Sequence, residues 1–245
     1  MPRFFAERVN IDETAGTAVI LGDDARHIAR SLRMAVGDGL TVSDGHGTDY
    51  ECTLTYIRDG ECHAKIESSS PSDAESPAFI TLYMAYPKSD KLELVVQKAV
   101  ELGASRIVPF VSERCIKRPK AEKEEKQTER LSRIAEEAAK QCGRGRLPEV
   151  TPPISYRELL NKINEGELTL FCYEGNGTEP LSAVLSEPIP ARLSVVVGSE
   201  GGFTPNEARA ARDAGARLVN LGTRILRCET APMYCLSAIS FVLEL

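Results

Sequence analysis

Two apolar, strand-like runs near the C-terminal end of the sequence both stop abruptly at glycine. Residues 193–197 lead into Gly-Ser-Glu-Gly-Gly at 198–202, and residues 217–221 lead into Gly-Thr-Arg-Ile-Leu-Arg at 222–227. Glycine allows backbone conformations and close approaches that other residues cannot adopt. Because ligands of open α/β sheets bind at the carboxyl ends of the strands, this pattern predicts an α/β fold whose binding site lies in the last fifth of the chain.

The C-terminal two thirds of the sequence alternates strand-like and helix-like segments, which predicts a mostly parallel sheet covered by helices. Thr204, Pro205 and Glu207 form a capping-box pattern with proline at the first helical position, so a helix is expected to begin there. That helix is expected to end before Gly215. The other predicted elements are strands at 80–86, 106–110, 168–173, 193–197 and 217–221, and helices ending at Gly103 or covering 121–141 and 231–243.

The N-terminal part has a different rhythm, with short β-like runs separated by glycine- and aspartate-rich turns. This pattern is typical of a small β-barrel. We therefore expect a β domain at 1–70, a polar and proline-containing linker at 71–78, and the α/β domain at 79–245. Within the first domain the predicted strands are 17–21, 39–43, 50–57 and 63–66, with one helix at 24–34.

Charge and cysteine content restrict the class of protein. The net charge is −6, but residues 1–75 carry −7 while residues 106–146 carry +5, so a polyanion is expected to meet the middle of the chain. No apolar run approaches the ~20 residues of a membrane helix, and the first residues do not resemble a signal peptide. Seven cysteines without a CxxC pair, and three histidines without metal-ligand spacing, indicate a cytoplasmic protein with reduced thiols and no metal site.

The two glycine loops contain the strongest candidate functional residues. Glu200 lies among the glycines of the first loop, and Arg224, Arg227 and Glu229 lie in or after the second. Guanidinium groups can hold phosphate or a developing oxyanion. The alternative is that the glycines make ordinary tight turns and that Glu229 caps a helix. Cys228 could act as a nucleophilic thiolate, although its apolar neighbours favour a packed and unreactive thiol.

A third candidate is the basic loop at 141–149, in which Arg144 and Arg146 stand among small residues. Such a loop suits contacts with nucleic-acid phosphates, and Lys88 and Arg114 could extend the same basic surface. The alternative interpretation is a surface loop that is basic without a specific role.

Taken together, these stretches resemble the signature of the RsmE-type bacterial ribosomal RNA methyltransferases of the SPOUT superfamily. The resemblance rests on Gly-Ser-Glu-Gly-Gly-Phe-Thr at 198–204, on Leu-Gly-Thr-Arg-Ile-Leu-Arg-Cys-Glu-Thr-Ala at 221–231, and on Gln-Cys-Gly-Arg at 141–144. Two positions depart from the usual family pattern, because Ser199 replaces a proline and Cys228 replaces a threonine.

The resemblance implies a PUA-like β-barrel followed by a SPOUT methyltransferase domain tied in a deep trefoil knot. It also implies a homodimer, bound S-adenosylmethionine, and N3 methylation of a uridine in the decoding region of 16S ribosomal RNA within the assembled 30S subunit. Neither a metal nor a membrane takes part.

By the same resemblance, each candidate residue has an expected role. Arg227 stabilises the uracil anion, and Glu200 or Glu229 handles the N3 proton. The residues expected to hold the cofactor are Val197, Gly198, Glu200, Gly201, Leu221, Gly222, Ile225 and Leu226. Those expected to contact RNA are Lys88, Arg114, Arg144, Arg146 and Arg224.

Two other functions stay open at this point. The chain could be an RNA-binding protein without catalysis, although that leaves the paired glycine loops unexplained. It could also be a SPOUT methyltransferase that acts on transfer RNA or on a ribose 2′-OH.

Overall fold

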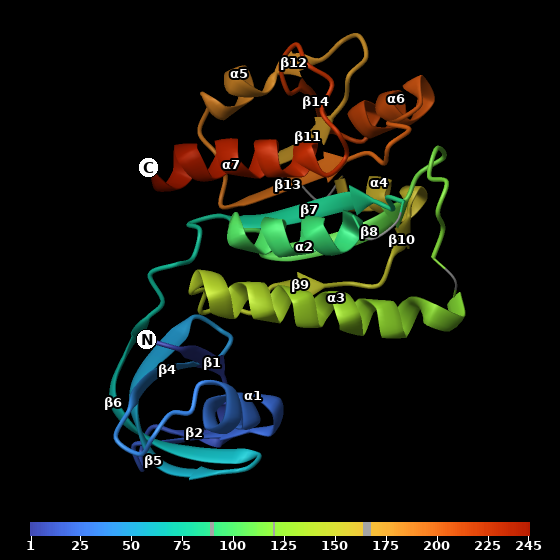
Figure 1. Ribbon diagram of the computed structural model, residues 1–245. Coiled ribbons are helices and arrows are strands. Elements are labelled where there is room, and N and C mark those ends of the chain that lie inside the picture. Colours follow the sequence, from blue (N-terminus) through green and yellow to red (C-terminus); the bar gives the residue numbers. More distant parts are fainter. Residues whose placement is uncertain (89–90, 120, 164–167) are drawn as a thin grey trace. The chain divides into compact units, whose positions relative to one another are not determined.

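The structure, a computed structural model, describes residues 1–88, 91–119, 121–163 and 168–245. The chain divides into two compact units (Figure 1). Unit 1 comprises Met1–Glu75 and Ala139–Leu147, and unit 2 comprises Ser76–Ala138 and Pro148–Leu245.

Unit 1 is built on a six-stranded sheet in the order β1-β4-β5-β6-β3-β2. The β1–β4 pair is parallel, and the other pairs are antiparallel. Apolar side chains of the sheet and of a short helical segment form its core, with Ile20, Ile28, Leu40 and Leu54 fully buried. The strands are β1 (Arg3–Phe5), β2 (Ile11–Asp12), β3 (Thr17–Leu21), β4 (Gly39–Ser43), β5 (Thr48–Arg58) and β6 (Glu61–Pro71), and the helical segments are η1 (Arg8–Asn10), α1 (Gly22–Arg26) and η2 (His27–Ser31).

The compact units differ from the predicted domains in one segment. Residues 139–147, which lie within the predicted domain 79–245, group with unit 1. Ser43 Oγ donates to the carbonyl of Gly145 at 2.8 Å, and the carboxylate of Glu75 accepts the N–H groups of Gly145 and Arg146 at 3.0 and 2.9 Å. These hydrogen bonds satisfy loop backbone that would otherwise be buried without partners.

Unit 2 contains a sheet in the order β10-β8-β7-β13-β11-β14-β12, with β9 also paired to β8. Every pair in this sheet is parallel, so the predicted parallel sheet is confirmed. Its strands are β7 (Phe79–Ala85), β8 (Arg106–Val111), β9 (Glu149–Val150), β10 (Ile154–Ser155), β11 (Leu168–Cys172), β12 (Glu179–Pro180), β13 (Arg192–Val197) and β14 (Arg217–Asn220).

Helices cover both faces of this sheet. Consecutive residues of β7 and β13 are buried, which is typical of parallel strands packed on both sides. Helix α2 packs against α7, and α7 also contacts β13, whereas α4 packs against α6 and β8. The helices are α2 (Lys91–Glu101), α3 (Ala121–Cys142), α4 (Tyr156–Ile163), α5 (Leu181–Leu185), α6 (Pro205–Asp213) and α7 (Thr230–Glu244), of which α4 and α5 were not predicted.

The predicted capping box at the start of α6 is confirmed. Thr204 Oγ1 accepts the N–H of Glu207 at 3.2 Å, and the Glu207 carboxylate accepts the N–H of Thr204 at 2.9 Å. This cap fixes the point at which the first glycine loop turns into the helix. Among the described helices, none has the length and apolar character needed to cross a bilayer.

Candidate active site

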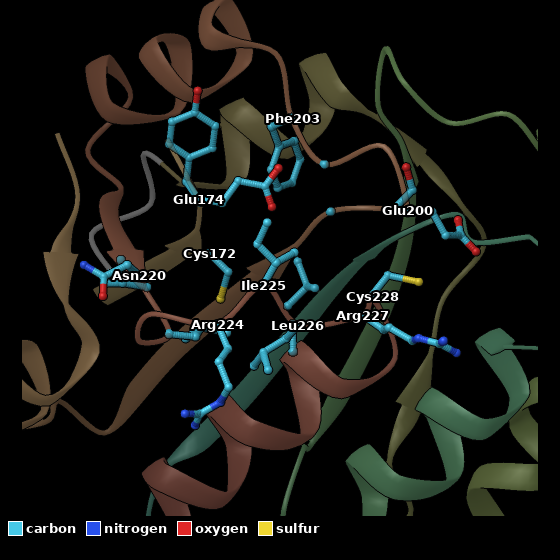
Figure 2. A pocket seen from close by; sticks show the side chains of 18 of the residues that line it. Cys172, Glu174, Glu200, Phe203, Asn220, Arg224, Ile225, Leu226, Arg227 and Cys228 are labelled. Carbon is cyan, nitrogen blue, oxygen red and sulfur yellow. The ribbon is translucent and has the colours of Figure 1, made fainter. Parts of the chain in front are cut away.

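A cavity of about 510 Å³ lies where β11, β13 and β14 end, at the edge that the sequence predicted. Figure 2 shows that both glycine loops contribute to its wall. Most of the predicted site residues line it, namely Val197, Gly198, Glu200, Leu221, Gly222, Arg224, Ile225, Leu226 and Arg227.

The first loop needs glycine because it folds closely on itself. A Cβ atom at Gly198 would lie 3.1 Å from the ring of Phe203 and 3.2 Å from Cα of Gly202. Gly202 has a φ of +61°, which side-chain-bearing residues rarely adopt. Phe203 anchors the loop, because its ring packs 4.2 Å from that of Phe171 in the core. The loop therefore presents backbone to the cavity.

The second loop presents an apolar surface. The side chain of Ile225 is 85% exposed, although it lies within the cavity, and Leu221 and Leu226 are half-buried beside it. Figure 2 shows Glu174, from the end of β11, extending its carboxylate toward the middle of the cavity. The site thus combines an apolar wall with a few polar groups, as small-molecule sites commonly do.

A cluster of charged side chains joins the two loops through a residue that the sequence reasoning missed. Nζ of Lys91, in the first turn of α2, lies 3.2 Å from Oε1 of Glu200 and 3.0 Å from Oε2 of Glu229. The N–H of Lys88 donates to the same Glu200 carboxylate at 3.1 Å. The sequence signal for Lys91 is its position just after β7, which is the neighbour of β13 in the sheet.

Electrostatics keep this cluster charged. Burial raises the pKa of the Glu200 carboxyl, but hydrogen bonds from its own N–H, from the N–H of Lys88 and from Lys91 outweigh burial, and the net pKa is lowered. The pKa of Glu229 is lowered by the same balance, in which its own N–H, Lys91 and Cys228 oppose burial. The hydrogen bond to Glu229 raises the pKa of Lys91 against the effect of burial. At neutral pH the cluster is one ammonium between two carboxylates.

Cys228 belongs to the same cluster as a buried thiol. Its thiol donates to Oε2 of Glu229 at 3.3 Å. Burial, together with the carboxylates of Glu229 and Glu200, raises the pKa of this thiol to about 12. Because the thiolate is the reactive form, the burial and the raised pKa of Cys228 support the interpretation of a packed, unreactive thiol.

The two arginines of the second loop are exposed. Neither Arg224 nor Arg227 forms a side-chain hydrogen bond or ion pair with any residue that the structure describes. They extend from the loop in different directions, and Arg227 points to the side where Glu200 and Cys228 lie (Figure 2). Both guanidinium groups are available to an anionic ligand.

The remaining predicted residues occupy other places. Arg114 donates to the carbonyl of Gly201 at 3.1 Å, so Gly201 faces Arg114 in place of the cavity. Arg144 is only 3% exposed and pairs with Glu75 at 2.8 Å, so in this structure it has a structural role within unit 1 in place of the predicted RNA contact. Arg146 is exposed on unit 1. Within the described part of the chain, no cluster of His, Cys, Asp or Glu is arranged to hold a metal ion.

Comparison with known proteins shows the family of the chain. Residues 74–240 match the family described as RNA methyltransferase domain, and residues 20–67 match the RNA methyltransferase PUA domain. The chain is 33% identical over 251 residues to ribosomal RNA small subunit methyltransferase E of Bacillus subtilis, covering 100% of this chain and 98% of the relative. It is 34% identical to the protein of the same name from Synechocystis, covering 93% of this chain and 74% of that relative.

The fold of the chain also matches the solved structure of a relative. Ribosomal RNA small subunit methyltransferase E from Neisseria gonorrhoeae, bound to S-adenosyl methionine, superimposes with a TM-score of 0.88 at 33% identity. The match covers 99% of this chain and 98% of that chain. The resemblance found in the sequence motifs is therefore confirmed, and the chain belongs to the ribosomal RNA small subunit methyltransferase E family, with an RNA methyltransferase domain and a PUA domain.

Proposed function

We propose that this protein transfers the methyl group of S-adenosylmethionine to N3 of a uridine in the decoding region of 16S ribosomal RNA, within the assembled 30S subunit. The observation that carries the proposal is the cavity between two glycine loops, which joins a backbone cradle to a cluster of charged side chains. The names of the relatives, and the S-adenosyl methionine in one of their structures, support the cofactor and the class of substrate.

The cavity fits this cofactor. Its volume lies within the range of pockets that bury small ligands. A Cβ atom at Gly198 would press on Phe203 and one at Gly202 on the Glu174 carboxylate, so the loop lies at the cavity as bare backbone at these positions. An adenosine group can therefore lie against backbone, with Ile225 as an apolar contact. The residues that would hold the cofactor are Val197, Gly198, Glu200, Leu221, Gly222, Ile225 and Leu226.

The charged groups suit the chemistry at uracil N3. This nitrogen carries a proton at neutral pH, so the proton must leave before the lone pair can attack a methyl group. Glu200 and Glu229 are both ionised, and either can accept the proton. The negative charge that then spreads onto O2 and O4 needs a cation, and Arg227 is an exposed guanidinium at the cavity. Bound S-adenosylmethionine supplies the electrophilic methyl group.

The RNA would be held by exposed basic residues. Lys88, Arg114 and Arg224 are exposed near the carboxyl ends of the strands of unit 2, and Arg146 is exposed on unit 1. Such side chains position nucleic acid through its phosphates. The target base would be presented to the cavity out of its stack.

Two finer features of the fold belong to the same proposal. We propose that unit 1 closes into a barrel and that the chain of unit 2 is threaded as a trefoil knot. The position of β14 between the earlier strands β11 and β12 supports the threading, since such an insertion brings the last strand between elements already laid down. Cytoplasmic localisation is part of the proposal and is supported by seven free cysteines.

A homodimer is also proposed, because an apolar groove remains open on unit 2. The groove has a volume of about 490 Å³ and runs between α5 and α7, where Tyr234 and Phe241 are exposed. It reaches Leu221 and Gly222 of the second loop, so a second copy seated there would lie beside the cavity. Light scattering after size exclusion should give the mass of two chains, and Phe241→Asp should give the mass of one.

The test of function is methyl transfer with purified substrates. The protein, S-adenosylmethionine and unmethylated 30S subunits should give N3-methyluridine, mapped by mass spectrometry, whereas transfer RNA should stay unmodified. Arg227→Ala should lower turnover by about 10²- to 10³-fold with cofactor binding by calorimetry nearly unchanged. Arg209→Ala, an exposed arginine of α6 outside the cavity, is the control. Methylation of a ribose or of transfer RNA, or no binding of the cofactor, would support the alternative functions.

A further inference from the structure

Among the described residues of the charged cluster, Lys91 pairs with a carboxylate from each loop. Its ammonium lies within 3.2 Å of a carboxylate oxygen from each loop, which places those two oxygens no more than about 6 Å apart. It also lies 3.8 Å from Sγ of Cys228. Three separate segments, α2 and the two loops, are thus linked through one side chain.

The charged side chains of the cluster are partly buried, so water screens the interactions between them only in part. The side chains of Lys91, Glu200 and Glu229 are 30%, 28% and 17% exposed. Two carboxylates this close repel one another, and partial burial weakens the screening by water. Without a cation between them, one carboxylate would take up a proton or the loops would move apart.

The position of Lys91 also explains why Arg227 has no partner. Arg227 is two residues before Glu229 and points to the same side of the cavity as Glu200 (Figure 2), yet it pairs with neither carboxylate in the described structure. Lys91 already pairs with both carboxylates and reduces the net charge of the three groups from −2 to −1. A cation that is not engaged with protein carboxylates can be offered to an anionic substrate.

We propose that Lys91 is a positioning residue that bridges Glu200 and Glu229, offsets part of their charge, fixes the two loops relative to each other, and thereby leaves Arg227 free for the uracil anion. This inference rests on the proposed function, since it names a role within the same reaction. Among the residues that the structure describes, the charged and titratable groups that contact the cluster or share the cavity with it are Lys91 on α2, Glu200 in the first loop, Arg224, Arg227, Cys228 and Glu229 in and after the second loop, and Cys172, Tyr173 and Glu174 at the end of β11; Lys88 contributes its N–H.

The effect on pH dependence has a definite sign. An ammonium at ion-pair distance stabilises the ionised carboxylates, so its removal makes them easier to protonate. In Lys91→Met the acidic limb of the kcat/KM profile should therefore move to higher pH by about one pH unit. Turnover at neutral pH should fall at least tenfold, because Arg227 then pairs with Glu200 and Glu229, which have lost their ion pairs with Lys91.

The matched control is Lys98→Met. Lys98 is on the same helix, is comparably exposed, and pairs with Glu101 at 2.8 Å, but lies away from the cavity. The control should keep the wild-type profile. Lys91→Arg, which keeps the charge, should restore the position of the acidic limb and most of the turnover.

The measurements separate this inference from the proposed function. If the wild type does not methylate 30S subunits, the proposed function fails. If the wild type methylates and Lys91→Met keeps both the wild-type turnover and the wild-type pH profile, the role of Lys91 fails. Equal losses in Lys91→Met and Lys91→Arg, without a change in the pH profile, would also overturn it, because they would show a requirement for shape and not for charge. Thermal unfolding of each variant identifies any loss caused by misfolding.

Discussion

The buried carboxylate of Glu207 holds the end of the first loop at the start of α6 through hydrogen bonds to backbone N–H groups. Its two oxygens accept the N–H of Thr204 at 2.9 Å and the N–H of Glu113 at 2.8 Å. The side chain is almost fully buried, so water cannot replace both interactions when it is removed. Glu207→Ala would leave two backbone donors without their charged acceptor.

The expected loss follows from these contacts. Hydrogen bonds to charged groups contribute about 1.5–3 kcal/mol each. Thr204 is half-buried and Glu113 is exposed, so water recovers part of both bonds. Glu207→Ala should therefore lower the free energy of unfolding by about 3–4 kcal/mol. For a chain of this size that corresponds to a fall in Tm of roughly 6–16 °C. Thr204→Ala, which removes a single cap, should cost about 1 kcal/mol.

Urea unfolding followed by circular dichroism measures both variants. Tyr156→Phe is a useful control, because the Tyr156 hydroxyl donates to the main-chain oxygen of Glu207 at 2.6 Å and not to its carboxylate. That variant should cost about 1 kcal/mol and leave the cap intact. A loss below 1 kcal/mol in Glu207→Ala, or a loss no larger than that of Thr204→Ala, would refute the reasoning.

Three further changes test other parts of the structure. Ser199→Ala should raise the free energy of unfolding by about 1 kcal/mol, and Tm with it, because the buried Ser199 hydroxyl has no hydrogen-bond partner among the described residues. A lower Tm in calorimetry without cofactor would contradict this. Glu75→Ala should destabilise unit 1 by about 3–5 kcal/mol, since it removes the carboxylate that pairs with the buried Arg144 and accepts the N–H groups of Gly145 and Arg146. Faster hydrogen exchange in β5 and β6 would show this loss. The hydrogen bond from the Arg217 guanidinium lowers the pKa of Glu179 by more than burial raises it. The pair therefore stabilises the fold at pH values above the ordinary carboxyl pKa. Its contribution is lost as the pH falls through the lowered pKa of Glu179. Acid titration of Glu179→Gln should accordingly show a weaker loss of stability than the wild type.

Local sequence signals predicted the regular elements well. The strands at 17–21 and 39–43 have the predicted limits, and the helix after Thr204 begins at its capping box. These elements depend on side-chain alternation and on hydrogen bonds between residues three apart, which are visible in the sequence. The two-residue strands β9, β10 and β12 carry too few residues to show any period.

The failures concern contacts between distant residues. Arg144 looked available for RNA because its loop is basic and polar, but its partner Glu75 lies 69 residues earlier in the chain. Lys91 escaped notice because its carboxylate partners are more than one hundred residues away. A basic residue on a helix is usually a solvated charge, and only the parallel order of β7, β13 and β11 brings this one to the site.

The most direct test of the central claim is a map of methylated bases in small-subunit ribosomal RNA. Mass spectrometry should find one N3-methyluridine of the decoding region missing from a strain that lacks this gene. The modification should return when the wild-type gene is supplied, but not when the Arg227→Ala gene is supplied. An unchanged set of base methylations in the deletion strain, or a lost methyl group on a ribose or on transfer RNA, would contradict the account.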